Sequence, residues 1–376
     1  MIVPILLGAL LSMMTSMTSM TTTTPGPAQA VLFDSGRWQW KATESRVEDH
    51  LGRKSLFLKG GNATVTDARF ANGAIEFDVA FTGERGFMGG FWRAQDAKNY
   101  EEFYLRPHQS GNPDATQYTP VFHGIEGWQL YHGERYTVPV THRFNEWTHV
   151  KILFADSRAE IYIRDMEKPV LFVDGLKRSV EPGGVGVTVG DFAPAYFSNF
   201  SFQAIDSPPI QGKAGVPEPV PPGVVPSWWV SDTFPEGALE GKDSLGPEQM
   251  AARRWTRLET ERSGLANLAR LQGIERRQNT VFARKVLVSD HEQIQQLDFG
   301  FSDRIRVYLN GRLLFRGNDT ARSRDYRFLG SIGYWDTLYL PLRKGENEIL
   351  FAVTEEVGGW GIQAKLPDAA GIVLQD

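Results

Sequence analysis

Cysteine is absent from the 376 residues of this chain. A protein without thiols has no disulfide bond, no thiolate ligand for a metal ion and no cysteine nucleophile. A strong charge of either sign is absent too, because 40 Lys and Arg residues oppose 45 Asp and Glu residues and leave a net charge of −5. This near balance gives no electrostatic reason to expect nucleic acid as a partner.

Motifs of several common enzyme classes are missing as well. The sequence contains no H-E-x-x-H, no G-x-S-x-G and no P-loop, which are the signatures of zinc proteases, α/β-hydrolases and P-loop nucleotide-binding proteins. Five of the seven histidines lie between positions 108 and 149, but their spacings match no metal-binding motif. An acidic D-x-D-x-D loop is absent too. We therefore expect no metal and no cofactor, with a structural calcium ion on backbone and Asp oxygens as the open alternative.

Long hydrophobic runs are also lacking. The N-terminal run "MIVPILLGALLSMM" is too short to span a bilayer as a helix. Ala28 and Ala30 then form the small-x-small pattern of a signal-peptidase site, although no Lys or Arg precedes the run. We therefore expect residues 1–30 to be a signal peptide and the mature protein to be secreted or periplasmic, with a disordered tail as the alternative. Without a cysteine near the cleavage site, a lipoprotein anchor is excluded.

The composition is that of a globular protein, with 41% hydrophobic and 23% charged residues. Proline is concentrated in one segment, 206–227, which contains seven prolines in 22 residues. Proline stiffens such a segment into an extended spacer. The sequence therefore predicts two domains, at 31–205 and 228–376, joined by a Pro-rich linker.

Strand patterns dominate both predicted domains. Residues 73–81 alternate between apolar and acidic side chains, and residues 147–165 predict a hairpin that turns at Asp156-Ser157. Many short strands between turn residues, without a convincing helix, indicate an antiparallel β-sandwich. In the second domain the dipeptide Asn310-Gly311 predicts a two-residue hairpin turn, which would place Val307 opposite Leu314.

Particular segments resemble known families. "GAIEFDVAF", "GGFWRAQDAKNYEEFYLRPH", "WTHVKILF" and "GGVGVTVGDFAPAYFSNFSF" resemble the concanavalin A-like (laminin-G-like) lectin/glucanase domain, close to the bacterial 3-keto-disaccharide hydrolase branch. The resemblance covers most of 35–204 and implies a jelly roll of two curved sheets, with the ligand or active site on the concave face. "LNG", "LPLRKGENE" and "GGWG" are similar to the galactose-binding-like β-sandwich that accompanies sugar-active domains.

The fold class expected from these patterns and resemblances is all-β, with two antiparallel β-sandwich (jelly-roll) domains. The second resemblance also bears on residues 247–271, where leucines at threefold spacing would alone suggest a helix. A galactose-binding-like domain implies strand and loop there instead.

The catalytic motif of the resembled glucanases is incomplete in this chain. Those enzymes carry E-x-D-x-E or E-x-D-x-x-E on a concave strand, because glycoside hydrolysis needs two carboxyl groups at a defined separation. Glu76 and Asp78 match the first two places, but Ala80 and Phe81 occupy the two possible third places. We therefore interpret Glu76 and Asp78 as polar residues of a strand surface.

A second row of polar residues follows in "NYEEFYLRPH", residues 99–108. Strand alternation separates two apolar residues from four polar ones, namely Phe103 and Leu105 from Glu102, Tyr104, Arg106 and His108. Planar polar groups bind sugar hydroxyls in pairs, and aromatic rings stack on sugar C–H surfaces. The candidate ligand-binding residues are Trp92, Arg93, Glu102, Tyr104, Arg106, His108, Gln117, His123 and Trp128, and the catalytic candidates are Glu102 and His108.

These observations favour an exported carbohydrate-binding protein that holds an oligo- or polysaccharide on the concave face of its first domain. One alternative is a glycoside-active enzyme, hydrolase or lyase, of the 3-keto-disaccharide hydrolase type, with Glu102 or His108 as general acid or base. Another is an adhesion or scaffold protein that binds other proteins. In the structural alternative for the row itself, Trp92 and Trp128 fill the core, and Glu102 pairs with Arg106. No membrane span is expected in the mature protein.

The cleavage pattern yields a direct test. If residues 1–30 are removed on export, N-terminal sequencing of the secreted protein reads Val31 as the first residue. Soluble cytoplasmic protein that retains Met1 would contradict this prediction.

Overall fold

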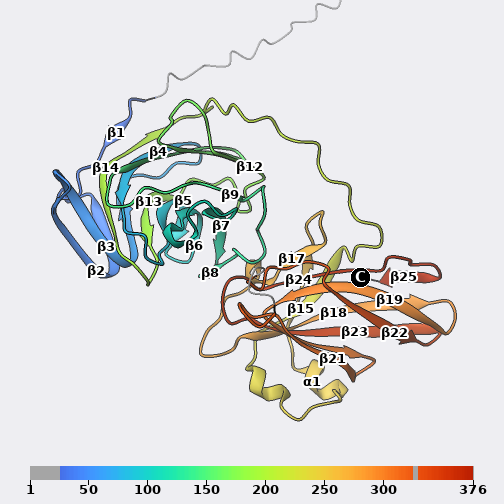
Figure 1. Ribbon diagram of the computed structural model, residues 1–376. Coiled ribbons are helices and arrows are strands. Elements are labelled where there is room, and N and C mark those ends of the chain that lie inside the picture. Colours follow the sequence, from blue (N-terminus) through green and yellow to red (C-terminus); the bar gives the residue numbers. More distant parts are fainter. Residues whose placement is uncertain (1–25, 325–328, 376) are drawn as a thin grey trace, which may run out of the picture.

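The computed structural model describes residues 26–324 and 329–375, and strands make up most of them (Figure 1). Within these ranges the one α-helix is the five-residue α1 (Pro247–Ala251). No helix of the described residues is both long and apolar enough to cross a membrane. The apolar run of the predicted signal peptide lies outside the described residues. The all-β fold class predicted from the sequence is confirmed.

The N-terminal part, here called the first sandwich, is one continuous antiparallel sheet that curls over on itself (Figure 1). Its strands follow the order β12-β11-β10-β4-β14-β3-β13-β5-β6-β7-β8, with β1, β2 and β9 attached beside β14, β3 and β7. The strands are β1 (Gln29–Ala30), β2 (Trp38–His50), β3 (Arg53–Val65), β4 (Gly73–Ala80), β5 (Met88–Asp96), β6 (Asn99–Leu105), β7 (Thr116–Phe122), β8 (Ile125–Glu126), β9 (Thr137–Val138), β10 (Thr148–Ala155), β11 (Arg158–Ile163), β12 (Leu171–Asp174), β13 (Gly184–Val189) and β14 (Ala195–Ala204).

The two halves of this sheet enclose an apolar core. A Cβ atom at Gly90 of β5 would lie 2.8 Å from the ring of Phe77 and 3.1 Å from Ile75, both on β4. The absence of a side chain at this position therefore lets the halves approach closely. Phe77 and Ile75 have no exposed surface, as the alternating pattern over 73–81 predicts.

The C-terminal part, here called the second sandwich, packs two sheets over a separate core. One sheet follows the order β16-β15-β18-β23-β20-β21, with β25 beside β18, and the other follows β17-β24-β19-β22. The strands are β15 (Ser227–Ser231), β16 (Trp255–Glu259), β17 (Leu265–Asn267), β18 (Thr280–Ser289), β19 (Gln293–Ser302), β20 (Arg304–Leu309), β21 (Arg312–Asn318), β22 (Asp336–Leu342), β23 (Gly345–Thr354), β24 (Gly361–Lys365) and β25 (Ile372–Gln375). The short α1 and strands β16 and β17 show that 247–271 is mostly strand and loop, as the resemblance implied.

The hairpin at Asn310-Gly311 forms, but its register differs from the prediction. Both residues have positive φ, 51° and 78°, which the predicted turn requires. Val307 pairs with Phe315 rather than with Leu314. The reason is a bulge between Val307 and Tyr308, because Leu314 is an extra residue in β21 that opposes no partner.

The proline-rich segment carries no strand or helix between residues 205 and 226 among the residues described. Part of it lies against the first sandwich, because the backbone N–H groups of Gln211 and Gly212 donate to Oε1 of Glu160 at 2.7 and 2.5 Å. Glu160 is fully buried, so these bonds supply partners that solvent does not. The predicted domain boundaries stay a prediction.

The inward face of β6 gives a test of the core. Phe103 has no exposed surface and lies in the core of the first sandwich. Phe103→Ala should lower the free energy of unfolding by about 3–5 kcal/mol, because the cavity cannot collapse fully. Phe192→Ala, which truncates a ring that is 50% exposed, should cost less than about 1 kcal/mol. Urea denaturation measures both. Equal losses would show that β6 does not face the core as described.

Candidate functional site

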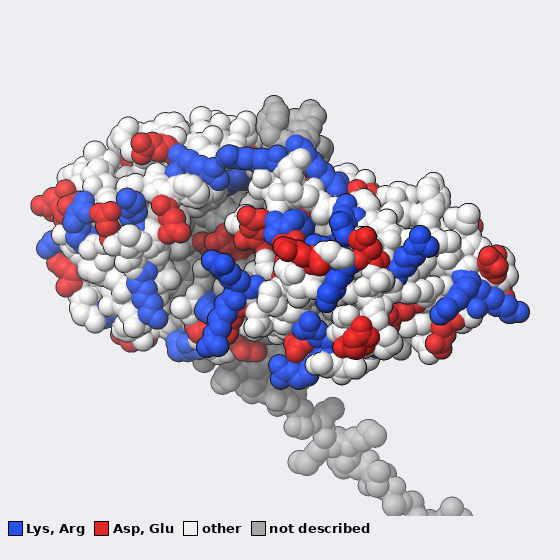
Figure 2. All heavy atoms as spheres, turned by 90° about the horizontal axis from the view of Figure 1, so that it is seen from below, with Lys and Arg blue, Asp and Glu red and all other residues white. Residues whose placement is uncertain are grey.

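One half of the curled sheet has a face that is concave and turns away from the core. Strands β3, β13, β5, β6, β7 and β8 arch around it in Figure 1, and Figure 2 looks toward it from below. Acidic side chains lie inside a depression there, with Lys and Arg side chains at its edges (Figure 2). We call this side the hollow.

Strand register assigns particular residues to the hollow. Phe103 and Leu105 point into the core, so Glu102 between them points the other way, as alternation requires. Glu102 pairs with Phe91 of β5 and with Thr119 of β7. These cross-strand neighbours share its face of the sheet.

One further acidic residue belongs to the hollow and was not predicted. Glu126 of β8 pairs with Val121, which lies two residues from Thr119 on the same face of β7. A tight turn at His123 (φ 52°) and Gly124 (φ 82°) folds β8 back onto β7. The dipeptide His-Gly between two apolar residues was the sequence signal for this turn, since two successive residues with positive φ characterise a type I′ hairpin.

Glu102 is the most unusual group in the hollow. It is 6% exposed, and its Oε2 is buried without a hydrogen-bond partner in the described part of the chain. Burial, and then the negative charge of Glu126, raise the pKa of Glu102 well above its usual value. A buried carboxylate with no partner costs several kcal/mol, so the fold favours the protonated form of Glu102.

Glu126 differs from Glu102 in access. Its side chain is exposed to solvent, but nearby protein atoms in the hollow displace part of the water around it. This partial desolvation, followed by the charge of Asp191, raises the pKa of Glu126. The hollow therefore holds two carboxyl groups whose pKa values are raised, and solvent reaches that of Glu126.

The predicted polar residues beside Glu102 are engaged with protein. The Tyr104 hydroxyl donates to Oε1 of Gln117 at 3.2 Å. The Gln117 amide nitrogen donates to the carbonyl oxygens of Trp128 and Tyr131, both at 2.9 Å. Gln117 therefore holds the loop after β8 in place, and its amide nitrogen has no hydrogen left for a ligand.

Arg106 and His108 lie at one end of this face, near Phe87. Arg106 forms an ion pair with Asp114 at 2.5 Å, so the alternative pairing of Glu102 with Arg106 is not what the structure contains. Burial and the charge of Arg106 lower the pKa of His108 to about 4. His108 is therefore neutral at pH 7 and is a poor general acid there.

Two expected ligand residues lie elsewhere. Trp92 has no exposed surface and packs in the core against Phe154, with ring centroids 5.7 Å apart. Arg93 is 1% exposed and donates to the backbone oxygens of Ala71 and Asp156 at 2.7 and 2.6 Å. The assignment of Trp92 and Arg93 to a ligand site is therefore corrected. Trp92 points inward by strand alternation, and Arg93 joins two loops.

His123 and Trp128 face the second sandwich rather than the hollow. His123 Nδ1 lies 2.7 Å from the carbonyl oxygen of Ala269. A Cβ atom at Gly358 would lie 2.6 Å from the indole of Trp128. The sequence did not predict that His123 and Trp128 contact the second sandwich, because these contacts join residues more than 140 positions apart.

Glu76 and Asp78 form a separate cluster on β4, in the other half of the sheet. His149 contacts Asp78 at 2.7 Å and Glu76 at 3.3 Å through its two ring nitrogens. These carboxylates raise the pKa of His149 to about 9, and the bond from His149 lowers the pKa of Glu76. Asp78 also accepts from Asn199 at 2.7 Å. Because each of these three groups already bonds to another, the cluster is an ion-pair network, with the side chains of His149 and Glu76 34% and 36% exposed.

Metal binding has no support in the described ranges, where no group of three or more His, Asp and Glu side chains could hold an ion.

Comparisons with known proteins concern the fold. No protein-family model matches the chain, and no curated protein matches it. Among solved structures, it is similar to the carbohydrate-binding module CBM66 from Bacillus subtilis, with 19% identity, a TM-score of 0.33, and 44% of this chain and 93% of that chain covered. It is also similar to the Bacillus licheniformis β-glucanase, with 10% identity, a TM-score of 0.35, and 48% and 98% covered. A third likeness is to SCLam, a non-specific endo-β-1,3(4)-glucanase from family GH16, with 9% identity, a TM-score of 0.34, and 49% and 91% covered.

The unpaired Glu102 carboxyl predicts a pH-dependent stability. Its folded-state pKa is raised, so the unfolded state ionises first as pH rises above about 4.3. From there until the folded-state pKa is passed, wild-type stability falls by about 1.4 kcal/mol per pH unit. Glu102→Gln lacks this loss. Glu102→Gln should therefore be more stable than wild type at pH 7 and equal to it below pH 4.

Denaturant unfolding of both proteins at pH 4 and pH 7 measures this difference. Glu134→Gln, which changes an exposed glutamate, should show no such pH-dependent gain. A Glu102→Gln protein that is less stable than wild type at pH 7 would mean that the carboxylate is stabilised in the fold.

Proposed function

We propose that the hollow of the first sandwich binds a carbohydrate at Glu102 and Glu126. The observation that carries this proposal is the Oε2 atom of Glu102, which is buried without a partner on a concave face. Buried polar groups in folded proteins are nearly always hydrogen-bonded, so each exception calls for an explanation, of which a catalytic role or an absent bound group is one. Oε2 of Glu102 is one of several such atoms in the described residues. A protonated carboxyl group donates one hydrogen bond and accepts others, as a sugar hydroxyl does.

The surroundings of Glu102 suit a sugar. Phe91 and Tyr100 lie beside it on the same face and line an adjacent groove of about 500 Å³, although neither Glu102 nor Glu126 is among the lining residues of that groove. Aromatic rings offer flat apolar surfaces to sugar C–H groups. The groove also presents the amides of Asn62 and Gln95, which donate and accept at once. The groove thus combines two aromatic rings with several polar and charged side chains, which suits a ligand rich in hydroxyl groups.

A second candidate function is glycoside hydrolysis in the same hollow. The pair of Glu102, whose pKa is raised well above its usual value, and Glu126, which water reaches, specifically favours it. Glycosidases use one protonated carboxyl group to donate to the leaving oxygen and a second carboxylate as nucleophile or base. Environments that treat two carboxyl groups differently assign these roles. Glu102 would be the acid, and Glu126 the second carboxylate.

The predicted export is part of the proposal, because a secreted or periplasmic protein meets polysaccharide. Support comes from the Ala28-Gln29-Ala30 pattern. The adhesion or scaffold alternative remains an outcome of the test below.

Binding and turnover are measured on the same proteins. A glycan array with wild type identifies a ligand, and calorimetry then compares Glu126→Gln with wild type. Loss of a charged hydrogen bond should weaken affinity by about 1.5–3 kcal/mol, or ten- to a hundredfold. Glu167→Gln, an exposed glutamate on the loop between β11 and β12, is the matched control and should bind as wild type does.

Reducing-sugar release from the bound glycans separates the two functions. Release that Glu102→Gln abolishes while binding persists identifies the enzyme. Binding without release identifies the binding module. Neither binding nor release across the array would contradict the proposal and favour the adhesion or scaffold alternative.

A further inference from the structure

Gln129 makes the largest set of hydrogen bonds between the loop after β8 and the second sandwich, and Tyr131 and His132 of the same loop add further ones. Gln129 is fully buried, and its four polar groups all bond across the interface. Its backbone N–H donates to Gly358 at 2.8 Å, and its carbonyl oxygen accepts from the N–H of Ile332 at 2.9 Å. Its side-chain nitrogen donates to the carbonyl of Leu329 at 2.9 Å, and its side-chain oxygen accepts from the hydroxyl of Ser302 at 2.8 Å.

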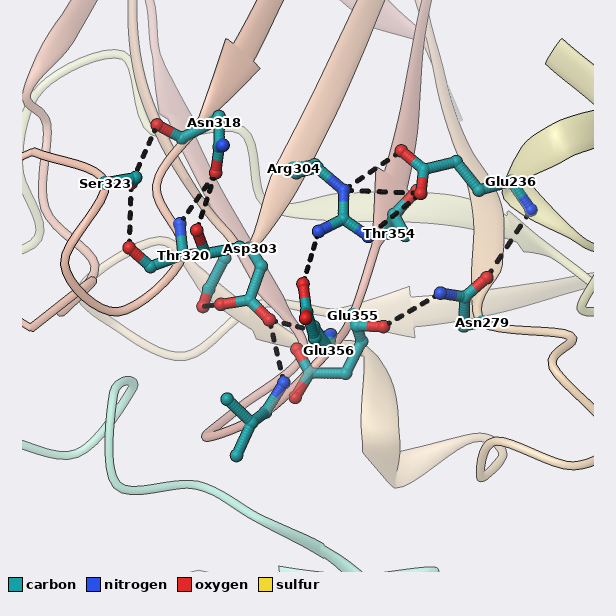
Figure 3. A network of polar contacts seen from close by, with 12 residues as sticks. Glu236, Asn279, Asp303, Arg304, Asn318, Thr320, Ser323, Thr354, Glu355 and Glu356 are labelled. Atoms are coloured by element: carbon teal, nitrogen blue, oxygen red, sulfur yellow. Dashed lines mark hydrogen bonds and ion pairs between the residues drawn. The ribbon is translucent and has the colours of Figure 1, made fainter. Parts of the chain in front are cut away.

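Hydrogen bonds within the second sandwich fix the surface that contacts Gln129. The Asp303 carboxylate accepts the N–H groups of Glu356 and Val357 at 2.7 and 2.8 Å (Figure 3). These bonds fix the turn that leads to Gly358, where a Cβ atom would lie 2.6 Å from the side-chain oxygen of Gln129. The receiving surface is therefore shaped for this glutamine.

The other side of the same loop contacts the residues of the hollow. Gly127, which follows Glu126, donates its N–H to the hydroxyl of Thr119 at 2.9 Å. Thr119 pairs directly with Glu102. Gln117 binds the loop carbonyls of Trp128 and Tyr131, as described above. The loop therefore links the hollow and the second sandwich, with Glu126 at its start and Gln129 in the interface.

We propose that the second sandwich positions Glu126 in the hollow, and that Gln129 is the positioning residue through which it does so. Release of Gln129 would leave its buried polar groups without partners and free the loop to move. The ligand site would then depend on docking of the two sandwiches rather than on the first one alone. This inference rests on the proposed function only for the identity of the ligand.

The test uses the full chain with Gln129→Glu. A carboxylate cannot donate to the Leu329 carbonyl, and it adds a negative charge next to Asp303 and Glu355, two carboxyl groups whose pKa values burial already raises. Hydrogen–deuterium exchange over residues 125–132 should become about tenfold faster, which corresponds to the loss of one net hydrogen bond. The affinity for the glycan identified with wild type should fall about tenfold.

Two further variants distinguish the loss of the Gln129 contacts from general misfolding. Ser302→Ala removes a single donor from the receiving surface and should give smaller changes in the same direction. Gln295→Glu changes a glutamine that is 4% exposed and bonds within the second sandwich, to the carbonyls of Gln296 and Asp368. It should leave exchange over 125–132 and the affinity unchanged.

Unchanged exchange over 125–132 in both Gln129→Glu and Ser302→Ala would overturn the proposal. Faster exchange with unaltered affinity would overturn it as well, because the loop would then move without consequence for the site. If wild type binds no glycan, the proposed function fails by itself. The exchange rate over residues 125–132 then tests the positioning role of Gln129 by itself. Faster exchange in Gln129→Glu supports that role, and an unchanged rate overturns it.

Discussion

The alternation of strand β6 is the constraint on which both the core and the hollow depend. In a strand, neighbouring side chains point to opposite faces, so each residue that β6 gives to the core commits the next one to the hollow. Phe103 and Leu105 have no exposed surface, and their burial holds the register of the strand. A shift by one residue would bury the polar set in the core. The position of Glu102 is therefore determined by the packing of its neighbours.

Two adjacent glutamates show what the two faces do to the same chemical group. Glu101 points to the core side and is fully buried, but the hydroxyl of Tyr118 donates to one oxygen at 2.7 Å and the N–H of Arg178 to the other at 2.9 Å. Glu102 points to the hollow and has an oxygen with no such partner. Glu101 is thus a satisfied structural group, whereas Glu102 retains unused hydrogen-bonding capacity on the side of the hollow.

Polar side-chain contacts join the two sandwiches close to the hollow. Tyr131 donates to Glu261 at 2.7 Å, and Lys177 forms an ion pair with the same carboxylate at 2.7 Å. Gln129 and Tyr131 thus attach the loop beyond β8 to the second sandwich, and Lys177 attaches the segment after β12 to the same carboxylate. A loop held on both sides loses less conformational freedom when it binds a ligand. The second sandwich thus serves the geometry of the hollow whether or not it binds a ligand itself.

Local patterns in the sequence determined the strands, the turn at Asp156-Ser157 and the division of β6 into an inner and an outer face, because side-chain alternation and turn chemistry act over a few residues. They did not determine the bulge at Leu314, which arises where β21 meets β20, nor the core position of Trp92. The partners of polar groups were equally out of reach. Whether Arg106 meets Glu102 or Asp114, and whether Glu126 lies beside Glu102, depends on how distant strands pack. Hydrogen bonds and pKa shifts follow from that packing, so only the tertiary structure decided which buried polar atoms of the described residues, Oε2 of Glu102 among them, are left without a partner.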